Sequence, residues 1–242
     1  QNGAYLTIQD GIDAAAYGDT VLVHDGVYSG EENRNLSWNG FSKQITLMSV
    51  NGPESTIIDA QGWNEGVDSQ PGRRVFIFDQ SGQSSDTVID GFTIKNGYLD
   101  GNSGLDGAGI YIHSSDPTFT NCIIRNNMNN RNCNNCASKG SGIFLHDSES
   151  TFTDCHITDN YTRAEVNHDH YDAWASGGGA YVQEGNVTFT RCVFSDNEAF
   201  TYDHNNNGES IGYAQGGAIY HNGGTLNLVD TEISNNTLDG YR

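Results

Sequence analysis

The chain has few basic side chains, few prolines and no long apolar run. Its 242 residues include 11 Lys and Arg against 31 Asp and Glu, which gives a formal charge of −20. Nucleic acids and anionic membranes bind basic surfaces, so neither is an expected partner. The sequence has no run of about 18 apolar residues, so no segment is expected to span a bilayer. The low content of Pro (3) beside 30 Gly is typical of turn-rich β structure.

The chain contains four copies of one sequence block of fixed length. The copies are Gly107–Asn127, Gly140–Asn160, Gly177–Asn197 and Gly216–Asn236. Their starts are 33, 37 and 39 residues apart, so all the variation in length falls between the blocks. Fixed blocks with joins of variable length predict a coiled repeat in which each turn stacks on the preceding one.

Four columns of this alignment carry similar side chains, and between them lie polar positions with a period of two. The columns are Phe119, Phe152, Phe189 and Leu228; Cys122, Cys155, Cys192 and Thr231; Ile124, Ile157, Phe194 and Ile233; and Asn127, Asn160, Asn197 and Asn236. In a parallel coil, the members of one column lie about 4.8 Å apart, the spacing of neighbouring strands. The pattern therefore predicts an all-β parallel β-helix with apolar and thiol columns inside and an amide ladder at a turn.

The whole chain, 1–242, is expected to form a single domain. Thr7–Tyr17 has helical spacing of apolar residues, and residues 1–19 are expected to cap the first rung with a short helix. Residues 20–97 are interpreted as irregular early rungs, because Ile89, Phe92 and Ile94 fall into the Phe, Cys and Ile columns. Residues 98–242 are expected to be regular rungs with long loops on one side.

Three stretches carry a resemblance to a known family: YLTIQDGIDAAAYGDTVLVHDGVYSG, ITLMSVNGPESTIIDAQG and the GAGIYI…FTNCIIRNN series. They resemble right-handed parallel β-helix repeat proteins of the pectate-lyase-like superfamily, of the secreted or surface-displayed bacterial kind. The resemblance implies a right-handed coil and an extracellular or cell-surface location. It implies little about activity, because the fold carries lyases, hydrolases, adhesins and structural arrays.

Catalytic motifs of the family's polygalacturonase-type hydrolases are missing. The N-T-D, D-D, G-H-G and R-I-K signatures do not occur in the sequence. A lyase would need acidic Ca²⁺ ligands beside an Arg or Lys base. Lys95 and Arg125 share an outward column, which also suits solvated strand positions. The expected function is therefore a structural, adhesive or glycan-binding element stabilised by Ca²⁺, and the alternative is a lyase or glycoside hydrolase acting on an acidic polysaccharide.

The joins between blocks leave one corner of successive rungs, so they are expected to cluster on one side and to carry any binding site. Two of them can be read as Ca²⁺ loops or as plain Asn/Gly turns, because alternating oxygen ligands precede a Gly. The ligand candidates are Asp203, Asn205 and Asn207 in one loop, and Asp100, Asn102 and Asp106 in the other.

A polar cluster occupies the third join. Its members are Arg163, His168, Asp169, His170 and Asp172. They suit metal binding or acid–base chemistry, but a solvated loop is the favoured interpretation, because no distant ligand would complete a site.

An aromatic column follows the glycines of each block, at Tyr111, Phe144, Tyr181 and Tyr220. These rings, with Trp174, would form a glycan platform if they face solvent. Packing beneath the loops is the favoured alternative.

The cysteines fall into two groups. Those of the Cys column are expected to be buried free thiols. Cys133 and Cys136, in C-N-N-C, are expected to form a local disulfide, with half a zinc site and a redox motif as alternatives.

The last block ends near Arg242 without a polar cap. Exposed strand edges would favour self-association or a further stretch of chain at that end.

Overall fold

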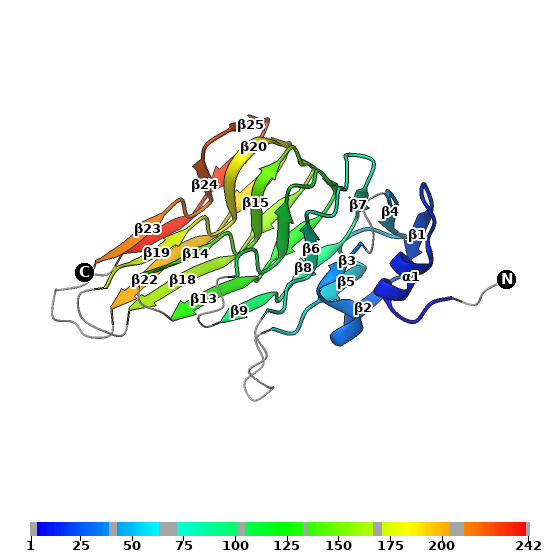
Figure 1. The fold of residues 1–242 in the computed structure, drawn as a ribbon, viewed down its shortest axis with the longest axis horizontal. Coiled ribbons are helices and arrows are strands. Elements are labelled where there is room, and N and C mark those ends of the chain that lie inside the picture. Colours follow the sequence, from blue (N-terminus) through cyan, green and yellow to red (C-terminus); the bar gives the residue numbers. More distant parts are fainter. Residues whose placement is uncertain are drawn as a thin grey trace.

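The structure is a computed structural model, and it describes residues 4–38, 43–62, 72–100, 105–132, 135–166, 171–203 and 211–240. The chain forms a parallel β-solenoid that coils from the N-terminal helix to the last rung (Figure 1). All the strand pairs are parallel within this part of the chain, apart from a single antiparallel bridge between Arg73 and Tyr98. The predicted fold class is confirmed.

Five stacks of strands, named sheets A to E, form the walls. Sheet A contains β1 (Thr20–Val23), β4 (Thr46–Ser49), β7 (Val88–Asp90), β11 (Thr118–Thr120), β16 (Thr151–Thr153) and β25 (Thr225–Val229). Sheet C contains β3 (Leu36–Ser37), β6 (Phe76–Asp79), β10 (Ile110–His113), β15 (Ile143–Ser148) and β24 (Ile219–Asn222). The long strand β20 (Ala180–Thr190) joins A and C into one 12-stranded sheet. Sheet B contains β2 (Gly26–Ser29), β5 (Thr56–Asp59), β8 (Thr93–Lys95), β12 (Ile123–Arg125), β17 (His156–Thr158), β21 (Val193–Ser195) and β26 (Glu232–Ser234).

The joins expected to be loops consist largely of strands. Sheet D contains β9 (Tyr98–Asp100), β13 (Met128–Asn132), β18 (Tyr161–Val166), β22 (Glu198–Asp203) and β27 (Thr237–Gly240), and sheet E contains β14 (Cys136–Lys139), β19 (Ala173–Ser176) and β23 (Gly212–Gln215). Sheets D and E lie together on one side of the coil (Figure 1). A small second core of Ala and Val side chains is buried there, including Ala164, Ala175 and Ala199. The backbones of successive joins pair as strands, so the joins stay in register with one another. Unpaired loops would not need a common register.

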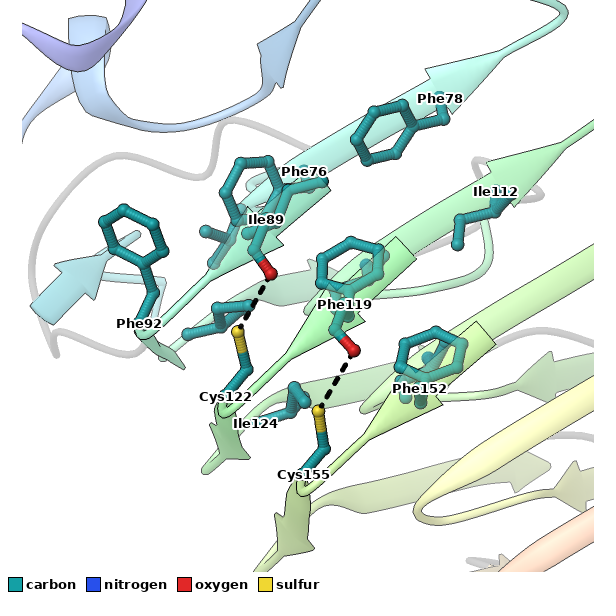
Figure 2. Packing of buried hydrophobic residues seen from close by; sticks show 14 of the residues in the cluster. Phe76, Phe78, Ile89, Phe92, Ile112, Phe119, Cys122, Ile124, Phe152 and Cys155 are labelled. Carbon is teal, nitrogen blue, oxygen red and sulfur yellow. Dashed lines mark hydrogen bonds between the residues drawn. The ribbon is translucent and has the colours of Figure 1, made fainter. Parts of the chain in front are cut away.

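The main core is built from the predicted apolar and thiol columns, whose members from the first three blocks lie stacked inside the coil, whereas Leu228 and Ile233 of the last block are exposed. The rings of Phe119 and Phe152 are 5.1 Å apart, and those of Phe152 and Phe189 are 4.8 Å apart. All three are fully buried. Figure 2 shows Phe119 and Phe152 of this column near Cys122 and Cys155, whose thiols donate to carbonyl oxygens of the preceding rung.

The asparagine column forms the predicted amide ladder. The Nδ2 of Asn127 donates to the Oδ1 of Asn160 at 3.0 Å, and the Nδ2 of Asn160 donates to Asn197 at 2.9 Å. Asn197 continues to Asn236 at 2.9 Å. The residue before each ladder member has a left-handed backbone, which Asn and Asp tolerate well. These residues are Asn126, Asp159, Asp196 and Asn235, with φ between 54° and 56°.

The two ends of the coil differ. At the N-terminus, α1 (Ile8–Ala14) lies against the first rungs, with Thr7 as its N-cap accepting from the Asp10 amide at 3.1 Å. The side chains of Ile8 and Ile12 in this helix are buried in the core, which confirms the predicted cap. A short 3₁₀ turn, η1 (Glu31–Asn33), follows β2. At the other end, apolar side chains of the last rung are half exposed, and association through this end stays a prediction. No helix in the described ranges is long and apolar enough to cross a membrane.

Cys122, Cys155 and Cys192 are buried free thiols. Burial raises the pKa of the Cys155 thiol well above its usual range. Cys136 is disulfide-bonded. Its expected partner, Cys133, lies outside the described residues, so this pairing stays a prediction.

Candidate functional site

The outer face of sheet C carries two parallel columns of side chains. Residues of each strand alternate between the core and the outer face, because the side chains of a strand have a period of two. One outward column is aromatic, with Tyr111 and Phe144 stacked at 5.4 Å, Phe144 and Tyr181 at 5.5 Å, and Tyr181 and Tyr220 at 5.1 Å. Parallel pairing in strict register holds these rings one above the other.

The second outward column is polar. His113 Nδ1 lies 3.0 Å from a carboxylate oxygen of Asp79, and the rings of His113 and His146 stack at 4.8 Å. His146 Nε2 is 3.4 Å from the Nε2 of Gln183 on the next rung. The column therefore presents a carboxylate, two imidazoles and an amide in successive rungs.

A cleft of about 380 Å³ opens over these columns. We call it the sheet C cleft, lined by Arg74, Ile77, Asp79, Leu105, Asp106, Tyr111, Lys139, Phe144, His146 and Gln183. Its floor is the outer face of β6, β10, β15 and β20. Its walls come from the segments that enter sheet C, including Asp106 before β10 and Lys139 at the end of β14. Ligand sites are usually concave and mix apolar walls with a few polar groups, as this cleft does.

Two cationic side chains of the cleft lie over rings of the aromatic column. The guanidinium carbon of Arg74 lies 4.4 Å from the centre of the Tyr111 ring, and Lys139 Nζ lies 5.1 Å from that of Tyr181. Arg74 is 8% exposed, and its Nε donates to the carbonyl oxygen of Asp106 at 2.9 Å. Burial lowers the pKa of Arg74. Ring faces attract cations, so the tyrosines fix where the positive charge is held.

A buried ion pair closes one wall of the cleft. Arg131 lies on β13 of sheet D, where its Nη2 is 2.9 Å from Asp106 Oδ1 and also donates to the Leu105 carbonyl oxygen at 2.6 Å. Burial raises the pKa of Asp106 to about 6, while the positive charges of Arg131, Lys139 and Arg74 oppose the rise. The pair attaches the segment before β10 to sheet D, which fixes the shape of the cleft.

The metal candidates are not brought together in the part of the chain that can be described. The Asp106 carboxylate is paired with Arg131, and Asp100 ends β9. Asp203 ends β22. Asn102, Asn205 and Asn207 lie outside the described residues. Over the described ranges, no group of three or more His, Cys, Asp or Glu side chains is placed to hold a metal ion. A Ca²⁺ loop around Asn205 and Asn207 stays a prediction.

The aromatic column is mostly covered. Phe144 and Tyr181 are 5% and 4% exposed, which corresponds to the packing alternative, because neighbouring rings cover each other's faces. Trp174 does not join this column. It lies on sheet E and stacks on Tyr213 at 5.5 Å.

The polar cluster of the third join is divided between two sheets. Arg163 lies on sheet D with its Nε 2.8 Å from Glu165. Asp172 precedes β19 of sheet E and accepts from the Ile211 amide at 3.2 Å, so it links successive rungs. His168, Asp169 and His170 lie outside the described residues.

Sequence reasoning missed most residues of the sheet C cleft. The polar column had a signal, since the seventh position of each block holds a polar side chain: His113, His146, Gln183 and Asn222. No sequence pattern indicated Arg74, because it precedes the four repeated blocks. Lys139 is one of only three lysines, which makes it a candidate base, but the length of its join hides its register.

The fold and the cleft together define a class, a parallel β-solenoid with a polar and aromatic cleft on one outer sheet face. Comparison with protein-family models, curated proteins and solved structures gives no match.

Proposed function

We propose that this chain is an extracellular or cell-surface glycan-binding β-helix that binds a polysaccharide in the sheet C cleft. The observation that carries this proposal is the lining of the cleft. Two aromatic rings, one imidazole, an amide and two cationic side chains line one hollow of about 380 Å³. Sugars present both apolar ring faces and hydroxyl groups, and a site for them needs this mixture.

The direction of the columns supports a polymer rather than a single small molecule. Asp79, His113, His146 and Gln183 repeat along the coil axis, one residue per rung. An extended chain lying along the axis would meet similar donors and acceptors at regular intervals. The acidic composition and the disulfide at Cys136 support an extracellular location.

Binding can be tested on a glycan array, followed by titration calorimetry with the polymers that bind. The informative variant is Gln183→Ala, which removes a cleft amide from a strand whose core residues stay unchanged. Its matched control is Asn186→Ala, an exposed amide on the same strand, whose nearest partner is Glu149 at 3.3 Å. We expect Gln183→Ala to weaken binding severalfold and the control to leave it unchanged. Equal affinities of the two variants, or no binding to any glycan, would contradict the proposal.

A second candidate function is cleavage of an acidic polysaccharide by a lyase or hydrolase mechanism. It is favoured by two features of the same cleft, the raised pKa of the Asp106 carboxyl and the Asp79–His113 pair. Perturbed carboxyl groups and oriented imidazoles are typical of acid–base catalysis. The test is ultraviolet absorbance of unsaturated products, together with a reducing-end assay. Turnover that His146→Ala abolishes would replace the binding proposal with this one.

Stabilisation by Ca²⁺ is a separate part of the proposal and concerns the loop with Asn205 and Asn207. If a cation binds there, added Ca²⁺ raises the melting temperature, and Asn205→Ala with Asn207→Ala removes that rise.

A further inference from the structure

Positive charge is concentrated at the sheet C cleft, although the protein as a whole is strongly acidic. The sequence has only 11 Lys and Arg. Three of them, Arg74, Arg131 and Lys139, lie around the Asp106 carboxylate at one end of the cleft. The cleft-lining carboxylates there are Asp79 and Asp106. Both have positive or imidazole partners, because Asp106 pairs with Arg131 and Asp79 bonds His113. Within the described ranges, neither Arg74 nor Lys139 forms a side-chain ion pair with a carboxylate.

Arg74 is held as a preformed donor. Only 8% of its surface is exposed, and its guanidinium carbon lies 4.4 Å from the centre of the Tyr111 ring. Its Nε donates a hydrogen bond to the carbonyl oxygen of Asp106. Among the described residues, its two terminal nitrogens have no hydrogen-bond partner, although the side chain lines the cleft. A buried guanidinium with unpaired N–H groups would normally be satisfied by an oxyanion, which it can bind through two parallel hydrogen bonds.

Lys139 provides a second charge beside the same hollow. Its side chain is half-buried, and its ammonium lies over the ring of Tyr181, on the rung after next from Tyr111. The structure records no hydrogen bond of this ammonium within the described ranges. Arg74 and Lys139 thus approach the cleft from different walls, each positioned by one tyrosine.

We propose that Arg74 and Lys139 form a subsite for one anionic group of the bound glycan, a carboxylate or a sulfate ester, and bind it directly without a bridging Ca²⁺. This inference rests on the proposed glycan-binding function. A bridging cation is disfavoured here for two reasons. The Asp106 carboxylate that would hold it is already paired with Arg131, and two further cations would repel it at close range.

The experiment measures affinity by titration calorimetry for three polymers of matched length: a neutral glucan, a polyuronate and a sulfated glycan. Each titration is run in EDTA and again with added Ca²⁺. We expect at least one charged polymer to bind tighter than the neutral one, with the same affinity in both buffers. The two charged polymers distinguish carboxylate from sulfate. Affinity for the charged polymer should also fall as salt rises.

Lys139→Gln is the main variant, because the lysine is only half-buried and its loss leaves the core intact. Arg125→Gln is the matched control, since it removes the same charge from the outer face of sheet B, where Arg125 contacts Asn126 at 3.5 Å. We expect Lys139→Gln to weaken binding of the charged polymer roughly three- to tenfold, as lost charged hydrogen bonds do, and the control to change it little. Arg74→Gln should weaken it by roughly tenfold or more. Its melting curve and its affinity for the neutral polymer show whether it still folds.

The outcomes distinguish failure of the anionic subsite from failure of the glycan-binding function. Equal binding of neutral and charged polymers, unchanged by Lys139→Gln, would overturn the anionic subsite and leave the glycan-binding function standing. Binding that requires Ca²⁺ would overturn the direct contact. Absence of binding to all three polymers would remove both proposals.

Discussion

Asn160 offers the sharpest test of the stacked architecture. Its side chain is 1% exposed and lies in the middle of the amide ladder. Its Nδ2 donates to the carbonyl of Ile124 at 2.9 Å, to that of Thr158 at 3.0 Å and to Asn197 Oδ1 at 2.9 Å. Its Oδ1 accepts from both nitrogens of Asn127, at 3.2 and 3.0 Å. Asn160→Ala removes all of these bonds from a site that water cannot reach.

The expected cost follows from the groups that lose partners. A buried polar group left unsatisfied costs about 1–3 kcal/mol, and here the Asn127 amide and the Ile124 carbonyl each lose a bond. Some of this cost is relieved, because Asn127 Nδ2 keeps its bond to the Ile94 carbonyl. We therefore expect the free energy of unfolding to fall by about 3–5 kcal/mol.

The measurement is urea denaturation followed by circular dichroism. Asn186→Ala, an exposed amide on β20, is the control and should change the free energy of unfolding by less than about 0.5 kcal/mol. Asn236→Ala should lie between the two, because Asn236 is only partly buried and its Nδ2 donates to two backbone carbonyls instead of to a further ladder amide. A loss below about 1 kcal/mol for Asn160→Ala would refute the reasoning that the ladder supports the coil.

Three further predictions concern the core, the cleft and the thiols. Phe152→Ala should lower the free energy of unfolding by about 3–5 kcal/mol in urea denaturation, because the ring is fully buried between two stacked neighbours; a loss under about 1 kcal/mol would contradict the packing. The folded-state pKa of Asp106, about 6, is raised above the ordinary value of 3.8, so its protonated form is favoured by folding. Its contribution is complete below pH 3.8 and is lost as the pH rises through about 6, which amounts to roughly 2–3 kcal/mol; Asp106→Asn should flatten the pH dependence of unfolding in that window, and an unchanged slope would contradict the assignment. The three free thiols should resist Ellman's reagent in the folded protein and react after denaturation, because Cys122, Cys155 and Cys192 are buried; rapid labelling of the native chain would contradict their burial.

The core of the fold could be predicted from sequence because each rung places its inward side chains in the same environment as the rungs beside it. A position between identical neighbours must suit them both, so Phe119, Phe152 and Phe189 appear as a readable column. Asn127 and Asn160 are readable for the same reason, since each amide bonds the next. The period of two along each strand and the columns of the alignment were enough to identify the inward-facing residues.

Sheets D and E and the sheet C cleft were harder to predict. The joins vary in length, so their register could not be aligned, and residues such as Ala164 and Ala175 gave no sign of facing one another across two sheets. The cleft depends on contacts between columns rather than along them. Arg74 meets Tyr111 from a segment outside the repeats, and Asp106 meets Arg131 across a join. Such pairs leave no periodic trace in a single sequence.

The exact register of the columns has a consequence for how the length of this protein can change. Because Phe119 and Asn127 offer the same contacts as Phe152 and Asn160, the segment from Gly140 to Ser176 can be excised as one module. The shortened chain would place Phe189 directly on Phe119 and let Asn127 bond Asn197, so its interior would close without a gap. Gain or loss of an entire coil is therefore a smaller perturbation than deletion of a few residues inside one.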